Sequence, residues 1–119
     1  MIDVFAVTRG VLHGHATLRV VGELDLATAP ELAAAVDAEL NSPLPSASLV
    51  VDLTDTAFLD SSGARSIAMA SRRARAVGIG LYVLCPPSNA RVRGTLSLLK
   101  FDDVMPIVDS VRPGIHPAD

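Results

Sequence analysis

Aromatic residues and cysteine are both scarce in this chain. Tryptophan is absent, and one tyrosine and three phenylalanines make up only 3% of the 119 residues. An apolar core must therefore be built mainly from Ala, Val, Leu and Ile. The single cysteine, Cys85, excludes an internal disulfide and a CxxC metal site. We expect this thiol to be a small core residue.

Charge and long apolar runs are also limited. Charged residues make up 19% of the chain and the net charge is −3, a balance that does not indicate disorder. The mildly acidic character and the lack of rings for base stacking argue against direct nucleic-acid binding. No apolar run approaches the ~20 residues of a membrane span. Residues 1–5 lack a basic region followed by a long apolar core, so we expect no signal peptide. We therefore expect one cytoplasmic domain without a membrane partner.

Short apolar runs that alternate with helix-forming segments predict an α/β domain. Strands are predicted at residues 4–8, 16–22, 49–53 and 81–85, with a strand or strand and turn in 101–108, and helices at 28–40, 62–77 and 86–99. The glycines within residues 9–15 suit the turn of an antiparallel hairpin. Strand–helix–strand units need right-handed parallel crossovers. We expect a mixed, mostly parallel β-sheet with an N-terminal antiparallel hairpin and helices packed mainly on one face.

Two predicted helices begin with capping signals. Thr28-Ala29-Pro30-Glu31 has the pattern of a capping box with proline in the first turn. Ser88 follows Pro86-Pro87 and is a natural cap for the last helix.

The most informative stretch leads from the strand at 49–53 to Asp60-Ser61-Ser62-Gly63, just before a helix. The start of a helix has unpaired N–H groups and a partial positive charge, which favour an anion. A phosphate on a serine would be stabilised there, and the carboxylates of Asp52 and Asp60 would oppose it. Taken alone, these residues fit either of two interpretations. They are an ordinary N-cap and tight turn, or they hold a serine whose phosphorylation acts as a switch.

Other polar residues also have two interpretations. Glu23 and Asp25 fit either an acid pair for proton chemistry or a turn that caps the following helix. Asp52 is either a loop-stabilising acceptor or part of a recognition surface. Arg65 lies one turn from Ser61, near enough to contact an acidic partner or a phosphate, or it belongs to a solvated helix face.

Two segments together resemble the signatures of STAS-domain anti-sigma factor antagonists. One is Asp60-Ser61-Ser62-Gly63, and the other is Gly22-Glu23-Leu24-Asp25-Leu26-Ala27-Thr28-Ala29-Pro30 upstream. The resemblance covers about residues 3–110, the predicted STAS domain, and leaves 111–119 as a flexible C-terminal tail. The family usually has glycine at the end of the last helix, where Lys100 stands here.

The resemblance implies the STAS fold and a bacterial regulator of transcription, for example in a stress response, that works by partner switching. The unphosphorylated protein would bind an anti-sigma factor serine kinase and release the sigma factor. Phosphorylation at Ser61 would switch it off, and a phosphoserine phosphatase would reset it. The implied partner-binding residues are Glu23, Asp25, Asp60, Ser62, Gly63 and Arg65. Gly63 would let a partner's active site approach the backbone closely.

No catalytic residue, metal site or cofactor is expected in this chain, because the partner kinase binds the ATP. One alternative is a non-switching STAS scaffold or an accessory component of a lipid-transport complex. A small hydrolase with a serine nucleophile is disfavoured, because His13, His15 and His116 fall in the hairpin turn and the tail.

Overall fold

The computed structural model describes residues 4–42 and 47–111 of the chain. Its elements, in order, are β1 (Ala6–Leu12), β2 (His15–Leu24), α1 (Ala29–Leu40), β3 (Ser48–Asp52), β4 (Thr56–Leu59), α2 (Ser61–Ala76), β5 (Gly80–Leu84), α3 (Ala90–Leu98), the 3-10 helix η1 (Phe101–Asp103) and β6 (Ile107–Val108). The sheet has the order β1-β2-β3-β5-β6, and β4 pairs with β2 beside this path. The pair β1–β2 is antiparallel and the other four pairs are parallel.

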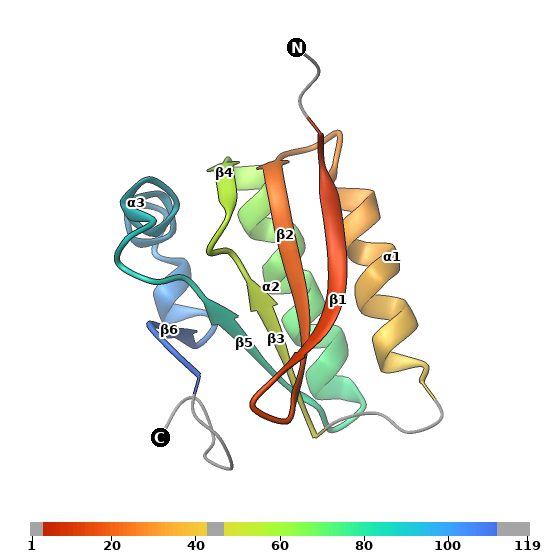
Figure 1. Ribbon diagram of the computed structural model, residues 1–119. Coiled ribbons are helices and arrows are strands. Elements are labelled where there is room, and N and C mark those ends of the chain that lie inside the picture. Colours follow the sequence, from red (N-terminus) through yellow and green to blue (C-terminus); the bar gives the residue numbers. More distant parts are fainter. Residues whose placement is uncertain (1–3, 43–46, 112–119) are drawn as a thin grey trace.

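Two helices cover one face of this sheet. Figure 1 shows α1 and α2 side by side behind the strands, and α3 beyond the sheet next to β4. Arg73 of α2 and Asp37 of α1 form an ion pair with an N–O distance of 3.1 Å. The predicted α/β class, the mixed sheet with its opening hairpin and the packing of helices mainly on one face are confirmed.

The core between the sheet and the helices is aliphatic. Inward residues alternate along β2, where Leu18 and Val20 are buried and Arg19 between them is exposed. Ile67 of α2 is fully buried against them in the same cluster. Cys85 also belongs to this cluster, and burial raises the pKa of its thiol. The cysteine is therefore a core residue, as predicted.

The hairpin turn is tighter than predicted. Its two central residues are His13 and Gly14, with φ angles of 51° and 84°. A two-residue turn with both φ angles positive matches the twist of the flanking strands, so both strands continue up to it. The expectation of a turn over residues 9–15 was wrong, because Gly10 lies within β1 and pairs with Thr17.

The strand β4 was not predicted. It starts after a turn that interrupts the apolar run, and its ladder with β2 is separate from the β2–β3 ladder. Residues 16–19 of β2 pair with β3, and residues 22–24 pair with β4, with a register shift between Gly22 and Glu23 inside this second ladder. As a result, β4 continues the sheet beyond the end of β3 and leads directly into α2.

The predicted capping box at the start of α1 does not form. Thr28 is the N-cap, but its side chain makes no capping hydrogen bond. Its hydroxyl instead donates to the Glu23 carbonyl at 2.7 Å and accepts from the Asp25 N–H at 3.0 Å. The threonine therefore secures the loop before the helix, while Pro30 lies in the first turn as expected.

The segment after α3 contains the predicted strand, but the tail begins later than predicted. The strand within 101–108 is the two-residue β6, which a 3-10 helix precedes. Val111, assigned to the tail, is only 7% exposed and packs with Val50 and Leu84 on the second face of the sheet. Val111 is thus part of the folded domain, and residues 112–119 of the predicted tail lie outside the described residues.

Lys100 adopts a left-handed backbone conformation of the kind that favours glycine. Its φ and ψ angles are 59° and 30°, in the left-handed region, and its N–H donates to the Ser97 carbonyl at 3.0 Å. This is the position after a helix C-cap where glycine is favoured, because a Cβ is strained there. The helix therefore ends in a conformation that favours glycine, and the lysine that stands there has a strained backbone.

We expect Lys100→Gly to stabilise the domain by about 0.5–1 kcal/mol, because it removes this strain at some cost in chain entropy. Urea unfolding would measure the change. The matched control is Lys100→Ala, which removes the charge but keeps the Cβ and should change stability by less than about 0.5 kcal/mol. A Gly variant no more stable than the Ala variant would contradict the prediction.

Candidate functional site

The candidate site lies where β2 and β4 end and α2 begins (Figure 1). Asp60 is the N-cap of α2, and its carboxylate accepts the Gly63 N–H at 2.8 Å. Ser61 is therefore the first residue of the helix, one position earlier than predicted, and it is exposed. Ser62 is half-buried in the same first turn. Of the two hydroxyls, that of Ser61 is the more accessible to another protein.

Gly63 is buried, which corrects the reason expected for a glycine here. A Cβ on this residue would lie 2.2 Å from the Leu24 carbonyl oxygen and 2.9 Å from the Leu59 Cδ1 atom. The missing side chain lets the first turn of α2 pack against the end of β2. The backbone that approaches Gly63 closely therefore belongs to this protein itself. A partner cannot reach the space that the absent side chain leaves.

The acidic loop between β2 and α1 is held mainly by Asp25. Its Oδ1 atom accepts from the N–H groups of Ala27 at 3.0 Å and Thr28 at 3.1 Å. These contacts form a turn of the kind that aspartate side chains favour. Asp25 is thus a turn residue, whereas Glu23 is exposed and pairs with Phe58 of β4 in the sheet. The loop is joined to the site through the Asp60 N–H, which donates to the Leu24 carbonyl at 3.4 Å.

Two exposed apolar side chains beside these residues were not predicted. Leu26 is 76% exposed in the acidic loop, and Phe58 is 40% exposed on β4. Phe58 and Glu23 line a shallow hollow of about 320 Å³ together with Val4 and Arg91. Exposed apolar residues beside a polar group are typical of interaction surfaces. The sequence could have indicated Leu26, because it is an apolar residue within a polar loop. It could have indicated Phe58, because the chain has only three phenylalanines.

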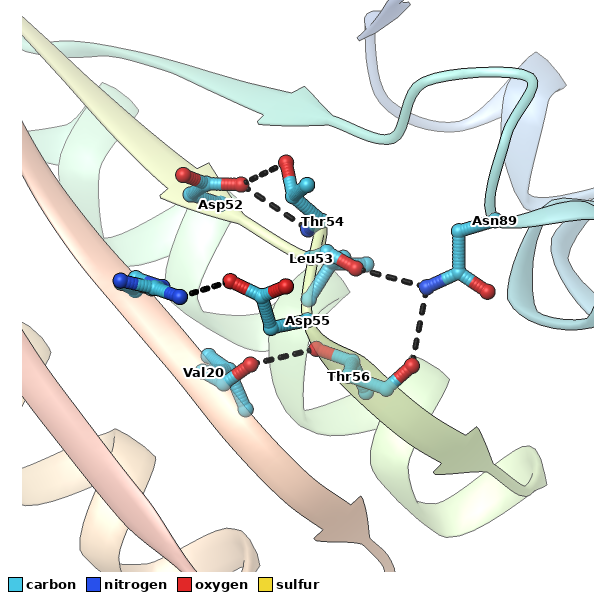
Figure 2. A network of polar contacts seen from close by, with 8 residues as sticks. Val20, Asp52, Leu53, Thr54, Asp55, Thr56 and Asn89 are labelled. Carbon is cyan, nitrogen blue, oxygen red and sulfur yellow. Dashed lines mark hydrogen bonds and ion pairs between the residues drawn. The ribbon is translucent and has the colours of Figure 1, made fainter.

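Asp52 has the loop-stabilising role that was one of its two interpretations. Figure 2 shows its carboxylate beside Thr54, where it accepts from the backbone N–H at 2.9 Å and from the hydroxyl at 2.5 Å. Next in the chain, Asp55 forms an ion pair with Arg19 of β2. The Thr56 hydroxyl donates to the Val20 carbonyl at 2.8 Å. The turn between β3 and β4 is therefore fixed to β2 by polar contacts.

Asn89 binds this same turn from the other side and was missed. Its Nδ2 donates to the carbonyls of Leu53 and Thr56, both at 2.8 Å (Figure 2). Its Oδ1 accepts the Val92 N–H at 3.4 Å and so caps α3. The expectation that Ser88 caps this helix was wrong, because the neighbouring amide can both cap the helix and donate to the two carbonyls. One side chain thus connects α3 to the β3–β4 turn.

We expect Asn89→Asp to destabilise the domain by about 2–3 kcal/mol. Aspartate can still accept the Val92 N–H, but it cannot donate to the two carbonyls and places a negative charge beside them. Urea unfolding would measure the loss. The matched control is Ser88→Ala on the exposed neighbour, which should stay within about 0.5 kcal/mol of the parent. If Asn89→Asp were as stable as the parent, only the hydrogen bond from the Val92 N–H would contribute to stability, and the bonds to the two carbonyls would not.

The remaining polar candidates lie in different places. Arg65 is exposed on α2, one turn beyond Ser61. His13 and His15 lie at the hairpin turn, at the opposite end of β2 from the site and about 30 Å away at 3.3 Å per residue (Figure 1). His15 Nδ1 lies 2.6 Å from the Ser48 hydroxyl, so only His13 is an exposed turn histidine. His116 lies outside the described residues.

Within residues 4–42 and 47–111, no group of three or more His, Cys, Asp or Glu side chains could hold a metal ion. Across the same ranges, none of the helices is long and apolar enough to cross a membrane.

Comparison with known proteins agrees with the signatures and the fold. The family model of the STAS domain matches residues 7–113, nearly the whole chain. This chain belongs to the STAS domain family. No curated protein sequence matches it significantly.

Several solved structures resemble this STAS domain over most of its length. An anti-sigma factor antagonist from Mycobacterium paratuberculosis has 27% identity and a TM-score of 0.70, with 92% of this chain and 89% of the other covered. The anti-sigma factor antagonist SpoIIAA in its unphosphorylated form has 19% identity and a TM-score of 0.64, covering 91% and 90%. The Bacillus cell fate determinant SpoIIAA in the phosphorylated form has 20% identity and a TM-score of 0.59, covering 88% and 91%. The two SpoIIAA structures show a shared fold.

Proposed function

We propose that this STAS domain is an anti-sigma factor antagonist whose binding to an anti-sigma factor serine kinase is switched off by phosphorylation of Ser61. The observation that carries the proposal is the position of Ser61, exposed as the first residue of α2. The domain is also similar at 27% identity to an anti-sigma factor antagonist. In this proposal the unphosphorylated form releases the sigma factor, and a phosphoserine phosphatase regenerates that form.

The surface around Ser61 suits a protein partner. Glu23 is exposed near the end of β2, Leu26 is exposed in the loop that follows, and Arg65 is exposed one helical turn from Ser61. Protein interfaces commonly have an apolar anchor residue at the centre and charged groups at the rim. The kinase would contact this surface and cover the serine hydroxyl.

The chemistry needs only an accessible hydroxyl from this chain. The Ser61 Oγ attacks the γ-phosphorus of ATP held by the kinase, a base on the kinase takes the hydroxyl proton, and ADP leaves. The product carries roughly two negative charges at neutral pH, next to the Asp60 carboxylate. Desolvating these charges in an interface is unfavourable, so the partner dissociates.

Catalysis by the chain itself has little support. A serine nucleophile needs a base within hydrogen-bond reach, and the described histidines lie at the far end of β2. The ATP and the catalytic base are therefore assigned to the kinase, and this chain needs no cofactor in the proposal.

The test is to incubate the full chain with its cognate anti-sigma factor kinase and ATP and to map the modified residue by mass spectrometry. We expect one added phosphate on Ser61, none in Ser61→Ala, and full modification in the matched control Ser62→Ala. A chain that binds the kinase but gains no phosphate would favour a non-switching scaffold. A chain that binds no such kinase would favour the accessory role in lipid transport.

A further inference from the structure

Ser61 and Arg65 lie on one exposed stripe of α2. The exposed residues Ser61, Arg65, Met69 and Arg72 recur at intervals of three or four, while Gly63, Ala64, Ile67 and Ala68 between them are buried. Residues four apart on a helix are neighbours, with about 5–6 Å between their Cβ atoms. The side chain of Arg65 is thus the first on this stripe that can reach a group attached to Ser61.

The guanidinium of Arg65 is available for such a group. Four other arginines form ion pairs with carboxylates, namely Arg9, Arg19, Arg73 and Arg93. Arg65 makes no ion pair or hydrogen bond through its side chain with any residue in 4–42 or 47–111. An unpaired cation therefore lies beside an exposed hydroxyl.

Three nearby carboxylates restrict the direction in which a phosphate on Ser61 can point. The Asp60 carboxylate is fixed beside the first turn of the helix by its bond to the Gly63 N–H at 2.8 Å. Glu23 lies near the end of β2 and Asp25 in the loop that follows, on either side of Leu24, whose carbonyl accepts the Asp60 N–H. A phosphate on Ser61 is repelled by all three carboxylates and attracted along the helix surface to the guanidinium.

We propose that Arg65 is the receptor for the phosphate on Ser61, forming an intrahelical phosphoserine–arginine pair four residues apart. This inference rests on the proposed function, which makes Ser61 the phosphate acceptor. A planar guanidinium offers two parallel N–H groups that match two phosphate oxygens, a fixed geometry that a lysine ammonium lacks. The pair holds the phosphate on the domain's own helix and withdraws Arg65 from any partner that contacts it in the unphosphorylated form.

The test uses the full chain with phosphoserine incorporated at position 61 during translation, so that no kinase is needed. The titration of the phosphate would be followed by ³¹P NMR in the parent, Arg65→Gln, Arg65→Lys and Arg72→Gln proteins. We expect the titration midpoint to lie about 0.5 pH unit lower in the parent than in Arg65→Gln, because a neighbouring cation favours the dianion. Arg65→Lys should fall between them.

Arg72→Gln is the matched control. It removes the same charge from the same stripe, about three turns away from the phosphate, and should leave the midpoint within about 0.1 unit of the parent. The three carboxylates are present in all four proteins, so their effect cancels in the comparison. Equal midpoints in the parent and Arg65→Gln would overturn the pair, as would an equal shift in Arg72→Gln.

The two proposals fail in different ways. If no kinase modifies Ser61, the proposed function fails, yet the difference between the parent and Arg65→Gln titrations remains measurable. If the kinase modifies Ser61 but the two titrations coincide, the switch stands and only the role of Arg65 is lost.

Discussion

Gly63→Ala should destabilise the domain by about 3 kcal/mol or more. The added Cβ would lie 2.2 Å from the Leu24 carbonyl oxygen and 2.9 Å from the carbonyl carbon, and neither backbone atom can rotate away as a side chain would. The start of α2 must then move away from β2. The loss of stability is therefore expected at the upper end of the range for substitutions that overpack a core. Urea unfolding monitored by circular dichroism would measure it.

The matched control is Gly94→Ala within α3. No atom lies within 4 Å of a Cβ built on Gly94, so alanine should stabilise this helix by about 0.5–1 kcal/mol. The two substitutions are chemically identical, and only their surroundings differ. If Gly63→Ala unfolded at the same urea concentration as the parent, the close packing of α2 on the end of β2 would be refuted.

Substitutions of Ser61 should separate binding from switching. We expect Ser61→Ala to bind the anti-sigma factor kinase as tightly as the parent, because the small exposed hydroxyl adds little to the contact. Phosphorylation should weaken binding by at least a hundredfold, equivalent to about 3 kcal/mol, and Ser61→Asp should show part of that loss. Isothermal titration calorimetry with the purified kinase would give the dissociation constants.

Ser110→Asp is a suitable control for the added charge. Ser110 is exposed after β6, and its neighbour Val111 packs with Val50 and Leu84 on the second face of the sheet, away from the face that α2 covers. The same change in net charge should leave its binding close to that of the parent. Comparable weakening in Ser110→Asp and Ser61→Asp would mean that total charge, rather than the position of Ser61, governs the interaction.

Much of the fold could be predicted because its signals are local. The apolar run before Asp52 defines the central strand β3, and the small apolar residues after Ser61 repeat at helical spacing along α2. The hairpin and the parallel crossovers then follow from chain order and handedness. These patterns depend on neighbours in the sequence, so the general architecture needs no knowledge of distant contacts.

Three of the misses arise where a residue's main partner is far away in the sequence. Ser88 and Asn89 are both good capping residues, and the choice between them depends on carbonyls 33 and 36 residues earlier in the chain. Gly63 has the local pattern of a turn glycine, yet the atom that excludes a side chain belongs to Leu24. The short strand β4 becomes a strand only because β2 extends past β3. Tertiary contacts decide each of these cases.

The Leu24 carbonyl faces both the Asp60 N–H and the Gly63 backbone, and this has a consequence for recognition. The acidic loop and the serine come from segments more than thirty residues apart, but they share one anchoring point and cannot shift independently. In the proposed function, the kinase would therefore meet them as a single preformed epitope. Grafting either segment alone into a homologous domain should transfer little of the specificity, whereas grafting both should transfer most of it.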